Sequence, residues 1–177
     1  MAFSGLKLHP TLVQSVKTLG FVTPTPVQSQ AIPKALEGRD LLACAATGSG
    51  KTAAFLLPIL HQLLDRPRGT TRALVLAPTR ELALQIRDDF VGLARNTGVR
   101  GAAVHGGVGM GPQEKAFRTG VDVLVATPGR LLDHFSRDYA RLDGLEYLVL
   151  DEADRMLDMG FIRDVRKIVA ALPAARQ

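Results

Sequence analysis

Eight consecutive residues in the first third of the chain combine glycines, hydroxyls and a lysine, groups that together bind phosphate. They are Ala45, Ala46, Thr47, Gly48, Ser49, Gly50, Lys51 and Thr52. Gly48 and Gly50 let the backbone turn its N–H groups toward one point, and a helix starting at Lys51 would add its positive end. The pattern predicts a phosphate loop, with alanine in place of the first glycine of the strict motif. The alternative is a glycine-rich turn that holds no ligand.

Within such a loop each polar side chain has a defined task. Lys51 would reach the β- and γ-phosphates of a nucleotide, and Thr52 would offer its hydroxyl to Mg²⁺. Magnesium bound to phosphates also needs a carboxylate ligand. Asp151 and Glu152 meet that need, because they follow the apolar run at 147–150.

The two carboxylates are expected at the carboxyl end of a parallel strand, where α/β proteins bind their ligands. Asp151 would hold Mg²⁺, in part through water. Glu152, one residue later, would point elsewhere and polarise an attacking water. Lys51, Asp151 and Glu152 are therefore the candidate catalytic residues. The alternative is that both acids only stabilise the start of a helix at 152–157.

The elements that must position these residues can be predicted from the alternation of apolar and amphipathic stretches. Buried parallel strands are expected at 40–44, 73–77, 102–104, 121–126 and 147–150. Helices are expected near 10–19, 26–36, 51–64, 80–95, 112–118, 128–136, 152–157 and 161–171. Strand–helix alternation predicts an α/β fold, a parallel β-sheet with helices on both faces. With no boundary visible, residues 1–177 are expected to form one domain.

Several helix ends have sequence signals of their own. Thr25 and Thr127 each precede a proline, which is typical of an N-cap followed by the first helical residue. Gly20 and Gly38 stand where a left-handed C-terminal cap is expected. Residues 66–72 are predicted to be a mobile loop.

The 177 residues carry 22 basic side chains, 16 of them Arg, and a net charge of +5. Such a charge fits a polyanionic partner, although an arginine-rich proteome explains it equally well. A single cysteine, Cys44, excludes a disulfide framework and a cysteine zinc site, and is expected to be a small buried apolar residue. With no signal peptide and no apolar stretch of ~18 residues, no membrane contact is expected and the location predicted is cytoplasmic.

Residues 151–154 read Asp-Glu-Ala-Asp, and with them the chain resembles the DEAD-box ATP-dependent RNA helicases over almost its whole length. Further similar segments are 20–28 (the Q motif, with Phe3 upstream), 78–83 (motif Ia), 105–107 (the GG element), 127–130 (motif Ib) and 156–161. The resemblance implies an N-terminal RecA-like domain with a phosphate loop, ATP and Mg²⁺ as cofactors, and RNA as partner. Ala46 stands where many relatives have Gln, at a position that varies in the family.

The resemblance implies that Phe21 and Gln28 bind the adenine base. An amide can donate to N7 and accept from N6 of adenine, whereas guanine presents acceptors at both positions. Phe21 offers a flat face on which the base can stack. Without the resemblance, Phe21 would be a core aromatic residue and Gln28 a solvated helix residue.

Six residues of the Ia, GG and Ib elements are expected to contact RNA: Arg80, Gly106, Gly107, Thr127, Gly129 and Arg130. Helix N-termini, hydroxyls and arginines bind phosphates without reading bases, so binding should be sequence-independent and steeply salt-dependent. The alternatives are an ion pair of Arg80 with Glu81 or Asp88, and a solvated charge at Arg130.

In the family a Ser-Ala-Thr motif and a second RecA-like domain follow the segment that corresponds to this chain. That second domain supplies arginine fingers, worth about 10³–10⁵ in rate in other phosphoryl-transfer systems. We therefore expect the ATP-binding half of an RNA helicase, nearly inactive alone, which remodels RNA duplexes once joined to the second domain. A stand-alone nucleotide switch or adaptor is the alternative; a DNA helicase of the same superfamily is disfavoured by the acidic box and Gln28.

Overall fold

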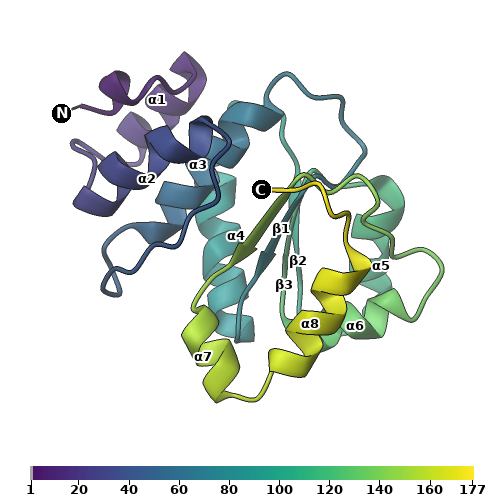
Figure 1. Ribbon diagram of the computed structural model, residues 1–177. Coiled ribbons are helices and arrows are strands. Elements are labelled where there is room, and N and C mark those ends of the chain that lie inside the picture. Colours follow the sequence, from purple (N-terminus) through teal and green to yellow (C-terminus); the bar gives the residue numbers. More distant parts are fainter. Residues whose placement is uncertain (1) are drawn as a thin grey trace. The chain divides into compact units, whose positions relative to one another are not determined.

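The computed structural model describes residues 2–177, which group into two compact units (Figure 1). The first unit contains the chain up to Arg66, the segment Asp88–Val99 and Gln177. The second contains Pro67–Arg87 and Arg100–Arg176. Among residues 2–177, no helix combines the length and the apolar character that crossing a bilayer requires.

The first unit is helical. Its elements are the 3₁₀ helix η1 (Phe3–Leu6), α1 (Pro10–Thr18), α2 (Pro26–Leu36), α3 (Lys51–Leu63) and the second half of α4 (Arg80–Ala94). Helices α2 and α3 pack against each other. Helix α3 is the most apolar of them, and Leu56, Leu57 and Leu60 are fully buried.

The helix ends in this unit confirm the sequence signals. Thr25 is the N-cap of α2: its hydroxyl accepts from the Gln28 N–H, and Pro26 is the first helical residue. Gly20 and Gly38 follow the ends of α1 and α2 with φ of +81° and +77°. These left-handed angles cost glycine little, which explains why glycine stands at both positions.

The strand predicted at 40–44 is wrong. These residues form no strand, and Leu42 is 95% exposed. Cys44 is exposed as well, so the prediction that it is buried is also wrong. An apolar run signals that burial would be favourable, but a strand also needs a neighbour for its backbone N–H and C=O groups. None of the described strands pairs with this segment.

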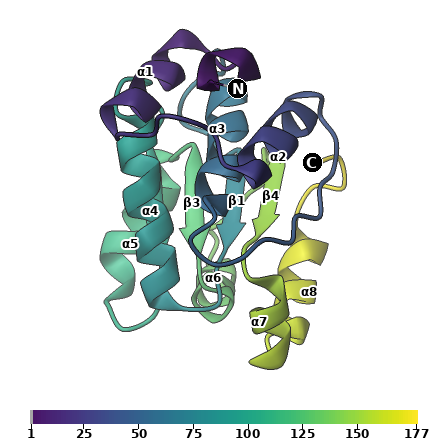
Figure 2. The same ribbon diagram turned by 90° about the vertical axis from the view of Figure 1, so that its left-hand side faces the viewer.

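The second unit contains a parallel sheet in the order β2-β3-β1-β4. Its strands are β1 (Ala73–Leu76), β2 (Gly101–Val104), β3 (Val123–Ala126) and β4 (Tyr147–Leu150). Figure 2 shows β3, β1 and β4 side by side. The last residues are in register: Leu76 is opposite both Ala126 and Leu150, and Ala126 is opposite Val104. The four segments that follow the strands therefore leave the sheet at one edge.

Both faces of this sheet are covered, as the fold prediction requires. On one face Leu74, Leu76 and Leu124 pack in a core with residues of the helices that follow the strands. Those helices are α5 (Met110–Thr119), α6 (Pro128–Phe135), α7 (Ala153–Asp158) and α8 (Ile162–Ala171). Figure 1 shows α5, α6 and α8 on the same side of the sheet. Val75 and Val125, which point to the opposite face, are also buried.

The segment predicted as a loop at 66–72 contains no helix or strand. Its end is fixed, however: the Thr71 hydroxyl donates to the Val121 carbonyl at 2.6 Å. Gly69 also lies so close to Gly120 that a Cβ atom at Gly120 would overlap its carbonyl group. This packing anchors the start of β1 to the segment before β3.

Candidate nucleotide-binding and nucleic-acid-binding sites

The candidate phosphate loop lies in the first unit, directly before α3. Gly48 and Gly50 have φ of +78° and +88°, angles that side-chain-bearing residues rarely adopt. The Lys51 ammonium donates to the carbonyl oxygens of Ala45 and Ala46, at 2.5 and 2.9 Å. The Ser49 hydroxyl is buried and has no hydrogen-bond partner among the described residues.

These groups fit a phosphate. An anion entering the loop would meet the ammonium of Lys51, the hydroxyl of Ser49 and the N-terminus of the 13-residue helix α3. Ala46 and Thr47 are exposed, and Thr52 is half-buried in the first turn of α3. The lysine is held by neutral carbonyls, so its charge remains available to an anion.

Gln28 is joined to this loop. The residue is only 2% exposed, which excludes the solvated-helix interpretation. Oε1 accepts from the Thr25 N–H at 3.0 Å, and Nε2 donates to the Gly50 carbonyl at 3.1 Å. A Cβ atom at Gly50 would overlap Nε2 of Gln28. Gly50 is thus required for close approach as well as for its φ angle.

The Gln28 amide keeps the hydrogen-bonding capacity that adenine needs. An amide oxygen accepts two bonds and an amide nitrogen donates two, and one of each is used by Thr25 and Gly50. The structural role of Gln28 was not among the sequence predictions. The signal was present, because a threonine followed three residues later by glutamine is a capping box.

Phe21 lies at the surface of the same unit. It is 41% exposed, so the interpretation as a core aromatic residue is wrong. Its ring contacts the buried Phe3, with centroids 6.3 Å apart and planes inclined by 43°. One part of the ring is therefore supported from within, and the rest is open for stacking.

The two candidate carboxylates lie at the carboxyl edge of the sheet in the second unit. Asp151 follows β4 directly, is 9% exposed, and accepts from the Glu152 N–H at 3.1 Å. Glu152 has a left-handed backbone with φ of +49°, which costs a residue with a side chain about 1–2 kcal/mol. Its carboxylate contacts the Arg155 guanidinium at 3.1 Å. Glu152 is the N-cap residue of α7, but its side chain makes no cap hydrogen bond.

The candidate RNA-contacting residues share that edge. Arg80 begins α4, and its guanidinium packs on the GG loop: a Cβ atom at Gly107 would lie 2.7 Å from Arg80 Nη1. From α6, Arg130 donates to the Val108 carbonyl at 2.8 Å. The side chain of Arg130 is only 15% exposed, so the interpretation as a solvated charge is wrong. The Ia, GG and Ib elements therefore meet around one loop.

Thr127 departs from the prediction in one respect. It is the N-cap residue of α6, and Pro128 follows it as predicted, but its hydroxyl makes no cap hydrogen bond. Its N–H instead continues the sheet by donating to the Val104 carbonyl at 3.0 Å. Gly106 and Gly129 are open, because a Cβ atom at either would meet nothing within 4 Å.

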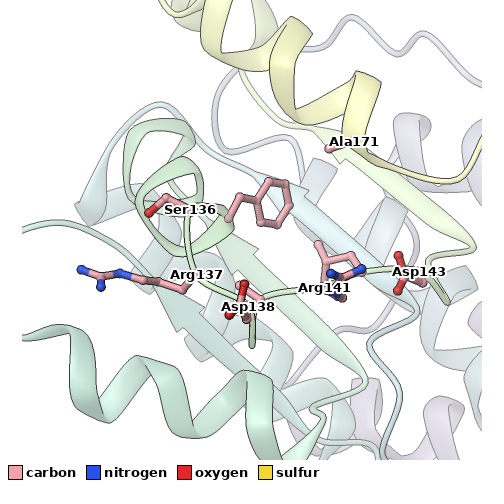
Figure 3. A pocket seen from close by; sticks show the side chains of 9 residues that line it. Ser136, Arg137, Asp138, Arg141, Asp143 and Ala171 are labelled. Carbon is pink, nitrogen blue, oxygen red and sulfur yellow. The ribbon is translucent and has the colours of Figure 1, made fainter.

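A hollow of about 240 Å³ lies elsewhere on this unit, between the residues that follow α6 and the end of α8 (Figure 3). Its lining includes Arg137, Arg141, Asp138 and Asp143, whose charges cancel. None of the candidate site residues predicted from the sequence lines this hollow, so it is not the candidate site.

The two units carry different parts of the chemistry. The first holds Phe21, Gln28 and the candidate phosphate loop, and the second holds the acidic pair and the candidate RNA-contacting residues at the carboxyl edge of a parallel sheet. These are the parts of a RecA-like phosphate-loop protein. The profile of the DEAD/DEAH box helicase family matches residues 25–177, and the chain belongs to that family.

Similar curated proteins have names that agree with this family. Over 99% of its length the chain is 49% identical to a probable ATP-dependent RNA helicase ddx27 of Dictyostelium discoideum. It is 46% identical, also over 99%, to the ATP-dependent RNA helicases RhlB of Erwinia tasmaniensis and CshA of Listeria monocytogenes. The chain spans 23%, 42% and 34% of these relatives, respectively.

Proposed function

We propose that this chain is the ATP-binding half of a DEAD-box RNA helicase. In this proposal residues 1–177 form a single N-terminal RecA-like domain, and a C-terminal RecA-like domain completes the enzyme. The joined domains couple ATP hydrolysis to local unwinding or remodelling of RNA duplexes. The observation that carries the proposal is the bond from Gln28 to Gly50, which links the base-reading amide to the phosphate loop at 3.1 Å.

Nucleotide binding is assigned to the first unit. Ala46–Gly50 supply backbone N–H groups to the phosphates and Lys51 supplies its ammonium, while Phe21 stacks on adenine and Gln28 reads its edge. The buried hydroxyl of Ser49, which has no protein partner among residues 2–177, supports an oxygen-rich ligand in this loop.

Magnesium is the proposed metal, and Thr52 and Asp151, in part through water, are the residues that would hold it. When bound, it would neutralise charge on the phosphate oxygens. Asp151 is suited to this role because its Oδ1 is fixed by the following N–H. Glu152 is the proposed group that polarises the attacking water, and Arg155 holds its carboxylate at 3.1 Å.

RNA binding is assigned to the edge where the strands end in register. Arg80 and Arg130 contact the phosphate backbone, and Gly106, Gly107 and Gly129 let that backbone approach closely. Thr127 adds a hydroxyl that α6 does not use. None of these groups reads a base, so the proposed binding is independent of sequence.

The proposal is tested by comparing ATP hydrolysis in the isolated chain and in a longer protein that carries a second RecA-like domain. The isolated chain should hydrolyse ATP very slowly with or without RNA, because the arginine fingers are missing. The longer protein should be stimulated by RNA. Robust RNA-stimulated hydrolysis by the isolated chain would contradict the proposal, and nucleotide binding without any stimulation in the longer protein would favour an adaptor.

A further inference from the structure

A set of three polar side chains, two buried and one half-buried, lies behind the GG loop, and no role in the proposed function is assigned to it. The set consists of Gln113 of α5, His134 of α6 and Tyr139, which follows α6. Gln113 is 6% exposed and His134 is fully buried. All three lie in the second unit.

Gln113 binds the backbone of the residue that follows β2. Its Nε2 donates to the His105 carbonyl at 2.9 Å, and its Oε1 accepts from the His105 N–H at 3.2 Å. Strand β2 is at an edge of the sheet, so the amide takes the place of a neighbouring strand at this residue. The pair of backbone partners also fixes which end of the amide is oxygen.

The orientation of the Gln113 amide determines which ring nitrogen of His134 carries the hydrogen. Its Nε2 lies 3.2 Å from Oε1 of Gln113, which can only accept, so Nε2 carries the hydrogen. In the neutral ring Nδ1 then accepts from the Tyr139 hydroxyl at 2.9 Å. Phe117 packs against the imidazole with ring centroids 4.9 Å apart. Both ring nitrogens of a fully buried histidine are thus satisfied.

Helix α6 holds the loop at two points. His134 lies one helical turn after Arg130, so both side chains are on one face of α6. Arg130 binds the Val108 carbonyl directly, and His134 reaches His105 through Gln113. Gly106 and Gly107 lie between these two anchors.

We propose that Gln113, His134 and Tyr139 are positioning residues that fix the loop at 105–108 against α6, so that the loop and Arg130 meet an RNA backbone as one preformed surface. This inference rests on the proposed RNA contacts of that surface. Two consecutive glycines have a large conformational freedom to lose when they bind, and anchors on both sides remove part of that cost beforehand.

The charged groups around His134 favour its neutral form. Burial lowers the pKa of His134, and Arg130 and Arg137 lower it further, while Asp133 and Glu114 oppose the shift. Arg118 adds a cation 5.2 Å from the centre of the Tyr139 ring. The three-residue set should therefore be intact at neutral pH.

The first test uses the ring nitrogens themselves. Long-range ¹H–¹⁵N correlation spectra of the chain at pH 7 report which imidazole nitrogen carries the hydrogen. We expect His134 to be neutral with the hydrogen on Nε2. A hydrogen on Nδ1, or on both nitrogens, would overturn the assigned connection to Gln113.

The second test removes single hydroxyl and amide groups. Tyr139→Phe keeps the ring and deletes the partner of His134; Gln113→Leu deletes both bonds to His105. Matched controls are Tyr147→Phe, in β4, and Gln14→Leu, on the exposed surface of α1. Hydrogen exchange of the amides at 106–108 reports the loop, and anisotropy of a labelled oligouridine reports binding.

We expect faster exchange at 106–108 in both variants. Oligouridine binding should weaken by about threefold to tenfold in Tyr139→Phe, which loses one hydrogen bond, and by more in Gln113→Leu, which loses both bonds to His105 and the contact with His134. The controls should match the parent chain. If Gln113→Leu fails to fold, Tyr139→Phe alone decides. Unchanged exchange or unchanged affinity in Tyr139→Phe would overturn the inference. If the parent chain binds no RNA but exchange is still faster in Tyr139→Phe, the RNA function is rejected and the anchoring of the loop stands.

Discussion

The variant Gly50→Ala should destabilise the chain through two separate effects. Gly50 has φ of +88°, and a side chain in this left-handed region costs about 1–2 kcal/mol. The added Cβ atom would also overlap Nε2 of Gln28 and lie 3.3 Å from its Cδ. Moving Gln28 away from the Gly50 carbonyl loses a hydrogen bond worth about 1 kcal/mol. The free energy of unfolding should therefore fall by about 2–3 kcal/mol, which lowers Tm by roughly 5–10 °C.

Two other glycines separate these effects. Gly38 has φ of +77°, but a Cβ atom added there would meet nothing within 4 Å, so Gly38→Ala measures the backbone cost alone. Gly111, in α5, has neither a positive φ nor a close neighbour, so Gly111→Ala should lose nothing. Thermal and urea unfolding of the three variants give the comparison. Equal losses in Gly50→Ala and Gly38→Ala would refute the argued role of the Gln28 contact.

Three further predictions concern charge. Arg80→Ala and Arg130→Ala should each reduce the slope of log affinity for oligouridine against log salt concentration by about 0.7, the value for one phosphate contact on a single strand. An unchanged slope would contradict the assignment of that arginine to an RNA phosphate. His61 accepts from the His9 N–H at 3.1 Å, and burial and then His9 lower the pKa of His61. The free energy of unfolding should therefore fall as pH drops below the ordinary histidine value. Urea unfolding at several pH values should show a flatter dependence in His61→Gln. Partial desolvation and then Asp88 raise the pKa of Asp89, so stability should fall as pH rises from the ordinary aspartate value through the folded pKa. Asp89→Asn should therefore stabilise the chain at pH 7 and not at pH 3, and the reverse pattern would show that the sign is wrong.

The sequence predicted those parts of the fold whose signals are local. The capping threonine at 25, the left-handed glycines at 20 and 38, and the strand before Asp151 depend on residues next to one another, and the structure confirms each. The common edge that unites the motifs follows from parallel pairing, which the apolar runs imply.

Features that depend on distant partners could not be predicted. The run at 40–44 has the composition of a strand, but no residue in it shows whether a neighbouring strand is present to pair with it. Likewise, Gln113 and His134 are 21 positions apart and match no spacing motif. Only the fold brings them together, because α5 packs against β2 and α6 follows β3, the strand paired with β2.

Recognition of adenine by Gln28, on a phosphate loop already formed in the first unit, is central to the proposed function. The most direct measurement is thermal unfolding of the chain with Mg²⁺ and ADP, AMP or GDP. A ligand that binds only the native state stabilises it by about 2.7 kcal/mol at a hundredfold excess over Kd. We predict a rise in Tm with ADP and AMP but not with GDP, lost in Gln28→Ala. Equal rises with ADP and GDP, or no rise with any nucleotide, would contradict this recognition.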